Sequence, residues 1–217
     1  MTERIAFIGG GNMASAIIGG LIKQGLSPQS IDVVEPLEEA RDKLQSGFGI
    51  AAQAQAGPFL SDAALVIWAV KPQIFRPAAL AVAAHTLQAL HLSVAAGIRS
   101  DSIAIWLSTD RVVRAMPNTP ALVGKGITGL FARAGVSAAD QTRITQVMAS
   151  TGESIWLDAE EKLDVVTALS GSGPAYVFYF MEAMTTAGIE MGLSREQAHQ
   201  LAVATFVGAS ELARSAS

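Results

Sequence analysis

The chain has 217 residues, a formal net charge of −4 and no cysteine, which excludes disulfides and thiolate metal sites and argues against nucleic acid as a partner. Charged residues make up 16% of the chain, against roughly 25% in soluble domains, and the mean hydropathy is +0.37, so the scarcity of polar surface indicates subunit contacts. The longest apolar run, at 63–70, is too short to span a bilayer and the N-terminus does not resemble a signal peptide, so we expect a cytoplasmic protein that does not bind membranes.

The first stretch, residues 4–17, predicts a dinucleotide site. An apolar strand at 5–8 runs into a glycine turn, and apolar residues then recur at helical spacing. Gly9 allows a tight turn, Gly11 lets the backbone approach a pyrophosphate, and Ala14 permits close packing of helix on strand. The N–H groups at the helix start favour an anion without any basic side chain. The predicted cofactor contacts in this stretch are Ile8, Gly9, Gly10, Gly11, Asn12 and Met13.

Glu35 ends the second predicted strand, residues 31–34, and stands 24 residues after Gly11. An acid at this position typically accepts a hydrogen bond from a ribose hydroxyl. The same carboxylate would repel a 2′-phosphate, so Glu35 favours NADH over NADPH.

Helices and strands continue to alternate along the first 158 residues. We expect helices at 36–45, 74–88, 101–107 and 138–149, and strands at 49–52, 64–70, 91–96, 111–116, 127–131 and 154–157. This alternation predicts an α/β domain over residues 1–158 with a doubly wound, Rossmann-like sheet.

After Asp158 the pattern contains helices only, so a second domain is expected over residues 159–217. A helix at 160–169 is followed by a glycine-rich segment, by a long apolar helix to about 192, and by a last helix that a capping box at Ser194 to Gln197 introduces. The long helix is apolar on nearly every face and must be buried, yet little chain is left to cover it. Either a partner subunit packs around it, or the natural protein continues beyond Ser217 and this domain is truncated.

Ligands of a doubly wound sheet bind at the carboxyl ends of its strands, which selects three further loops. Small residues in them let a nicotinamide and its ribose approach the backbone, and Lys71 can bind a ribose or phosphate oxygen or be an ordinary solvated lysine. The prolines around Asn118 have the alternative role of ending a strand. The additional cofactor contacts that we predict are Ala69, Val70, Lys71, Pro72, Ala95, Ala96, Gly97 and Asn118.

A second glycine-rich segment opens the long apolar helix and offers N–H donors that suit a substrate carboxylate as well as a simple helix start. Its predicted substrate contacts are Ser170, Gly171, Ser172 and Gly173. The histidines, His85, His91 and His199, lie away from the candidate loops. The pairs Glu38–Glu39 and Glu160–Glu161 occur in first turns of helices, where the dipole alone favours acids, so no metal site is predicted.

Five segments together resemble pyrroline-5-carboxylate reductases, in order and at similar spacing. They are residues 7–13 (FIGGGNM), 69–73 (AVKPQ), 95–97 (AAG), 116–121 (MPNTPA) and 169–176 (LSGSGPAY). The resemblance covers essentially the whole chain and implies reduction of 1-pyrroline-5-carboxylate to L-proline with NADPH or NADH. It also implies an all-helical C-terminal dimerisation domain, a homodimer, and larger rings such as decamers.

One departure from that family concerns the C-terminus. Members carry a further Ser/Thr-Gly-Gly-Thr motif whose hydroxyl is the usual candidate for bonding the substrate nitrogen, and this chain ends before it. The catalytic residue is therefore left unassigned. A 3-hydroxy acid dehydrogenase is a rival, but those enzymes use a lysine on the long helix and residues 174–189 contain none. A nucleotide-sensing module is the alternative from another class, and the second glycine-rich segment argues against it.

Overall fold

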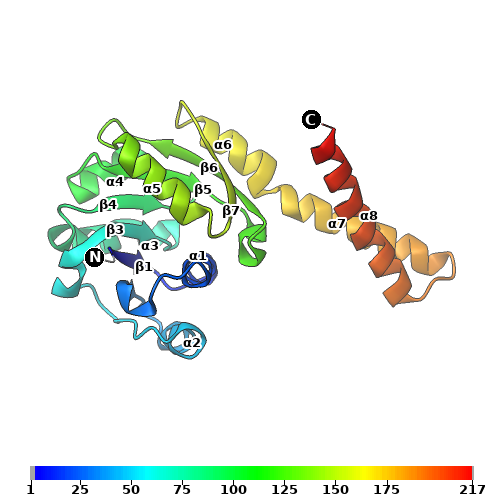
Figure 1. Ribbon diagram of the computed structural model, residues 1–217, viewed down its shortest axis with the longest axis horizontal. Coiled ribbons are helices and arrows are strands. Elements are labelled where there is room, and N and C mark those ends of the chain that lie inside the picture. Colours follow the sequence, from blue (N-terminus) through cyan, green and yellow to red (C-terminus); the bar gives the residue numbers. More distant parts are fainter. Residues whose placement is uncertain (1–2, 217) are drawn as a thin grey trace. The chain divides into compact units, whose positions relative to one another are not determined.

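The structure, a computed structural model, describes residues 3–216 and divides after Gly171 into two compact units. The first unit is a seven-stranded sheet with helices on both faces (Figure 1). Its strands are β1 Arg4–Ile8, β2 Ile31–Val34, β3 Ala63–Trp68, β4 Leu90–Ser93, β5 Val112–Met116, β6 Gly126–Ala132 and β7 Gly152–Trp156. Its α-helices are α1 Asn12–Lys23, α2 Glu38–Phe48, α3 Pro72–Val82, α4 Ser100–Leu107, α5 Ala138–Met148 and α6 Lys162–Val166.

The strand order is β2-β1-β3-β4-β5-β6-β7, and the first five strands are parallel. The predicted Rossmann-like class is confirmed, with the topological switch between β1 and β3. The far end of the sheet differs, because β6 runs antiparallel to β5 while β7 is parallel to β6. Between β5 and β6 the chain has only a short 3₁₀ helix, η4 Thr119–Val123, which is too short for the crossover that a parallel strand requires.

Two apolar layers hold helices against the two faces of the sheet. Consecutive residues of β1 contribute to opposite layers. Phe7 belongs to the layer under α1 and α5, and Ile8 belongs to the layer under α3 and α4. Trp68 and Phe75, both fully buried, stack in the second layer with ring centroids 4.9 Å apart. The packed sheet therefore supports the loops that follow its strands.

Two predicted elements differ clearly from the structure. The strand expected at 49–52 is absent, because Gly49 ends α2 in the left-handed conformation and only Gln53, one residue further on, pairs with β2 as an isolated bridge to Val34. The helix expected at 74–88 ends at Val82 and continues only as a 3₁₀ turn, Ala83–His85. The predicted domain boundary after Asp158 stays a prediction.

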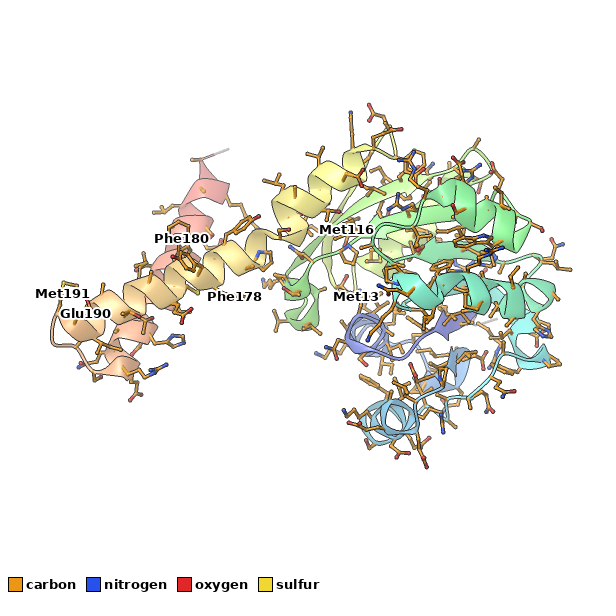
Figure 2. The ribbon with its side chains drawn as sticks, turned by 180° about the vertical axis from the view of Figure 1, so that it is seen from behind. Met13, Met116, Phe178, Phe180, Glu190 and Met191 are labelled. Carbon is orange, nitrogen blue, oxygen red and sulfur yellow. The ribbon has the colours of Figure 1, made fainter. Side chains whose placement is uncertain are left out.

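The second unit consists of two helices, α7 Gly173–Glu190 and α8 Arg195–Ser215. The predicted capping box is confirmed, because Gln197 N donates to Ser194 Oγ at 3.2 Å and Ser194 N donates to Gln197 Oε1 at 3.0 Å. Gly188 packs closely against Ala198, where an added Cβ would lie 2.8 Å from the alanine methyl. Aromatic side chains of α7, among them Phe178 and Phe180, are more than half exposed in the single chain (Figure 2).

Candidate functional site

The loops that follow β1 to β5 meet at one edge of the sheet, since these strands are parallel. Gly9 lies at the switch point, where its N–H donates to the Val34 carbonyl at 2.8 Å. Its φ of +98° is the left-handed conformation, and an added Cβ would lie 2.6 Å from the Ala69 carbonyl oxygen. Gly9 is thus required both by backbone conformation and by packing.

Gly11, the N-cap of α1, differs from Gly9 because neither its backbone conformation nor its packing within the protein requires a glycine. Its backbone is extended, no side chain caps the helix, and an added Cβ would meet no atom within 4 Å. Gly11 and Asn12 are exposed, and Met13 is half-buried. The open side of the turn therefore lies at a helix N-terminus, where N–H groups without intrahelical acceptors and the helix dipole favour a phosphate. These residues fit a dinucleotide.

The Glu35 carboxylate is buried against the glycine turn. Its Oε2 accepts from Gly10 N at 2.7 Å and its Oε1 from Leu37 N at 2.8 Å, and only 8% of the residue is exposed. Arg41 Nη1 donates to the carbonyls of Glu35 and Pro36, at 3.1 and 2.6 Å. Glu35 therefore orders the turn itself, a role that the spacing to Gly11 did not reveal, and its contact with a ribose stays a prediction.

The loops after β3 and β4 expose small groups at the same edge. Ala69 and Val70 are half-buried, and Ala69 N donates to the Ile8 carbonyl at 2.8 Å. Lys71 and Pro72 are exposed, and Lys71 is the N-cap of α3. After β4, Ala95 is buried, whereas Ala96 and Gly97 are exposed. The structure thus brings the loops containing these predicted contacts to the edge that carries the glycine turn.

Asn118 follows β5 and has a largely buried side chain, 9% exposed as a residue. Its Nδ2 donates to the Ser170 carbonyl at 3.1 Å, and its Oδ1 accepts from Ile127 N at 3.0 Å. One N–H and one lone pair of the amide are therefore used within the protein. A nicotinamide contact by Asn118, which the sequence predicted, stays a prediction.

The four predicted substrate contacts occupy an irregular helical stretch. Ser170 and Gly171 end a π-helical turn, Thr167–Gly171, whereas Ser172 is the N-cap and Gly173 the first residue of α7. The two residues after Gly173 offer no free N–H donor, because Pro174 has none and Ala175 N donates to the Ser172 carbonyl at 3.1 Å, and the predicted contacts of Ser170 to Gly173 stay a prediction. Single π turns of this kind are frequent at functional sites.

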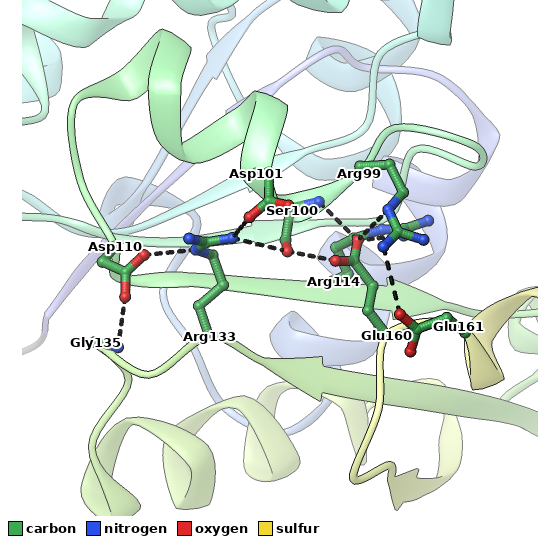
Figure 3. A network of polar contacts seen from close by, with 9 residues as sticks. All are labelled: Arg99, Ser100, Asp101, Asp110, Arg114, Arg133, Gly135, Glu160 and Glu161. Atoms are coloured by element: carbon green, nitrogen blue, oxygen red, sulfur yellow. Dashed lines mark hydrogen bonds and ion pairs between the residues drawn. The ribbon is translucent and has the colours of Figure 1, made fainter.

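Sequence reasoning missed a buried polar network around Glu160 (Figure 3). The carboxylate accepts from Ser100 N and Ser100 Oγ, both at 2.7 Å, and from Arg114 Nη1 at 2.6 Å. Burial by itself raises the pKa of Glu160, but the Ser100 hydrogen bonds and the Arg114 charge outweigh it, so the pKa lies below its usual value. Arg133 extends the network to Ser100, Asp101 and Asp110. The network ties the segment before α6 to β5 and α4.

None of the three histidines belongs to the candidate loops, and the buried one, His91, has a hydrogen-bond partner in the core. His91 on β4 accepts a hydrogen bond at Nδ1 from Trp68 Nε1 at 3.1 Å. Burial lowers the pKa of His91 to about 4, against an opposing hydrogen bond with the Thr86 backbone. His91 is therefore neutral near pH 7 and serves the core.

Residues 3–216 show neither a metal centre nor a membrane-spanning helix. No group of three or more histidine, aspartate or glutamate side chains in that range is arranged to hold a metal ion. None of the helices described there has the length and apolar character needed to cross a membrane.

Two family models match the chain. Residues 4–97 match the model described as NADP oxidoreductase coenzyme F420-dependent, and residues 160–217 match the one described as pyrroline-5-carboxylate reductase dimerisation. The first match contains the glycine turn, and the second begins at Glu160.

Individual relatives agree with these matches. A pyrroline-5-carboxylate reductase of Pseudomonas aeruginosa is 46% identical over 216 residues, which are 99% of this chain and 79% of the relative. The structure of a pyrroline-5-carboxylate reductase from Coxiella burnetii is similar with a TM-score of 0.92 and 35% identity, over 99% of this chain and 81% of that one. The Plasmodium falciparum enzyme, solved with NADP bound, has a TM-score of 0.86 and 25% identity, over 97% of this chain and 78% of that one.

Proposed function

The chain belongs to the pyrroline-5-carboxylate reductase family, and we propose from this membership which of its residues hold the cofactor and the substrate. It is an NAD(P)H-dependent oxidoreductase that reduces the C=N bond of 1-pyrroline-5-carboxylate to give L-proline, in proline biosynthesis. The observation that carries the proposal is the open turn at Gly11, which lies at the switch point of the sheet.

The dinucleotide would lie across the carboxyl edge of the sheet. Its pyrophosphate would contact the turn from Gly9 to Met13, and Glu35 would accept from the adenosine ribose through a lone pair that Gly10 and Leu37 leave unused. The loops that include Lys71 and Gly97 would hold the nicotinamide half. Gly11 supports this arrangement because its exposed side faces no protein atom.

The substrate carboxylate would bind the segment from Ser170 to Gly173. Bound NAD(P)H supplies a hydride to the imine carbon. A protonated cyclic imine is already a good electrophile, so the protein chiefly has to hold the ring in position, and positioning alone can remove several kcal/mol of barrier. This requirement agrees with a carboxyl edge whose candidate loops carry no histidine. The proton donor stays unassigned.

The chain carries a dimerisation domain over residues 160–217, and this agrees with the exposed aromatic residues of α7. We propose a homodimer formed by α7 and α8 that assembles further into rings such as decamers. We also propose that the enzyme acts in the cytoplasm and that its domain boundary follows Asp158.

The direct test is oxidation of NADPH and NADH, followed at the nicotinamide absorbance, with 1-pyrroline-5-carboxylate as substrate. It should use this chain and a form extended by the C-terminal segment of the Pseudomonas aeruginosa relative. Replacement of Ser172 by leucine should raise the KM for the imine in the active form, whereas Ser46→Leu on the exposed face of α2 should not. Absence of turnover in both forms, with dinucleotide bound, would contradict the assignment.

A further inference from the structure

The carbonyl of Ser170 lacks the donor that a regular α-helix would give it. In an α-helix this oxygen accepts from the N–H four residues later, and that residue is Pro174, which has no N–H. The donor of a π-helix would be the N–H of Ala175, but Ala175 N donates to the Ser172 carbonyl. Ser170 is half-buried, and a backbone carbonyl that is partly shielded from water and lacks a donor is stabilised by a donor from elsewhere.

Asn118 supplies that donor, from a residue 52 positions earlier in the chain. Its Nδ2 lies 3.1 Å from the Ser170 carbonyl oxygen. The amide is itself held in place, because its Oδ1 accepts from Ile127 N at the start of β6 and its backbone carbonyl accepts from Ala121 N at 3.1 Å. The side chain therefore has a fixed orientation toward Ser170.

The turn that Asn118 contacts, and the residue just before it, pack against the neighbouring strands. Gly171 approaches Met116, where an added Cβ would lie 2.9 Å from the methionine Cε. Val166, one residue before the π turn, packs on Gly129 of β6, where an added Cβ would lie 2.9 Å from Val166 Cγ2. Met116 at the end of β5 thus contacts the turn itself, and Gly129 of β6 contacts the residue just before it.

We propose that Asn118 is a positioning residue for the imine: by donating to the Ser170 carbonyl, it fixes the π turn whose end, Ser170 and Gly171, holds the substrate. Pro174 and Asn118 form a complementary pair, in which the proline removes a backbone donor and the asparagine replaces it. This inference rests on the proposed function of the segment from Ser170 to Gly173.

The test compares Asn118→Asp, which keeps the shape and the acceptor but loses the donor, with the unchanged enzyme, in whichever of the two forms named above is active. The unchanged enzyme must first turn over 1-pyrroline-5-carboxylate, so failure of the assigned function is seen separately. We expect Asn118→Asp to raise the KM for the imine about tenfold, while the Kd for NADPH or NADH, from quenching of protein fluorescence, changes by less than about twofold. If the Asp variant does not fold, Asn118→Ser, which removes the amide without adding charge, is judged by the same two constants.

Pro174→Ala provides the matched control, because it restores a backbone N–H where the helix can offer it to Ser170. In the Asn118→Asp background, Pro174→Ala should reverse most of the rise in KM for the imine. Alone, Pro174→Ala should change this KM little. A weaker dinucleotide Kd with an unchanged KM for the imine would overturn the proposal and make Asn118 a cofactor ligand. A lower melting temperature with both constants unchanged would also overturn it, since the hydrogen bond would then be only structural.

Discussion

The backbone N–H of Gly10 donates to the Glu35 carboxylate at 2.7 Å, so the end of β2 is hydrogen-bonded to the middle of the glycine turn. The Glu35 side chain, which would select the cofactor, is thereby hydrogen-bonded to the backbone that would hold the cofactor's phosphates. A change at Glu35 should consequently alter both.

Replacing Glu35 by glutamine should shift cofactor use toward NADPH. The change removes a negative charge from the place where a 2′-phosphate would lie, so the ratio of kcat/KM for NADPH to that for NADH should rise about tenfold or more. The glutamine can accept from only one of Gly10 N and Leu37 N, so unfolding free energy should fall by about 1–3 kcal/mol. A lower melting temperature with an unchanged ratio would show that Glu35 acts on the fold alone.

Replacing Gly11 by valine should abolish dinucleotide binding without unfolding the protein. The N-cap has a φ of −74°, which any residue adopts, and an added Cβ meets no protein atom within 4 Å. Titration with NADH should show a Kd at least about 100-fold higher, at an unchanged melting temperature. Gly47→Ala is the control, since Gly47 lies exposed in α2 and the change should keep the Kd and stabilise the helix by about 0.5–1 kcal/mol. Normal NADH binding by Gly11→Val would exclude the turn as the phosphate site.

Replacing Glu160 by glutamine should strongly destabilise the first unit. Arg114, 5% exposed, would lose its charged partner, and breaking a buried ion pair typically costs about 3–5 kcal/mol. Chemical denaturation at pH 7 measures the loss. Lys43→Met, which breaks the exposed pair with Glu39, should change stability by less than about 0.5 kcal/mol. Equal losses in the two variants would show that the Glu160 network contributes nothing beyond a surface ion pair.

Stability should fall between pH 6.5 and pH 4 because of His91. The unfolded histidine binds a proton near pH 6.5, whereas the folded one binds it only at about 4, so the unfolded state takes up more protons in this window and stability decreases as pH falls. The full difference corresponds to about 3 kcal/mol. His91→Gln, which keeps an acceptor for Trp68 Nε1, should flatten the denaturation free energy over this window, and His85→Gln should not. A pH profile that His91→Gln leaves unchanged would assign the loss to other groups.

Replacing Phe180 by aspartate should prevent dimer formation. The side chain is 59% exposed on α7 in the single chain, and a charge at an apolar interface is costly. Light scattering coupled to size-exclusion chromatography should give the mass of a monomer for this variant. Ile105→Asp is the control, because Ile105 on α4 is even more exposed, at 75%, and lies outside the dimerisation domain. A dimer that persists with Phe180→Asp would place the interface elsewhere.

Local patterns predicted the parallel half of the sheet well. The run from Ile5 to Ile8 is apolar on both sides and is followed by Gly9, so its length and end were readable from sequence. The antiparallel direction of β6 follows from the short connection after Asn118, which leaves no room for a crossover helix, and the strand residues themselves do not reveal it. The strand expected at 49–52 failed because pairing with β2 begins only at Gln53.

The candidate site could be predicted as a set of loops, but its internal contacts could not. Glu160 sits in a sequence typical of a helix start, and only the fold brings Ser100 and Arg114 to its carboxylate. The contact at the π turn was hidden for the same reason. Pro174 in the sequence shows that the Ser170 carbonyl lacks its helical donor, but only the fold shows that Asn118 donates to this carbonyl instead.

The exposed apolar side chains of α7 and α8 have a consequence for how the protein is made and kept folded. Where these helices are covered only by a second copy, the folded state is favoured by mass action, and the melting temperature must rise with protein concentration. Refolding then includes a bimolecular association step, whose rate rises with protein concentration. The stability of this reductase in the cell therefore depends on how abundant the protein is.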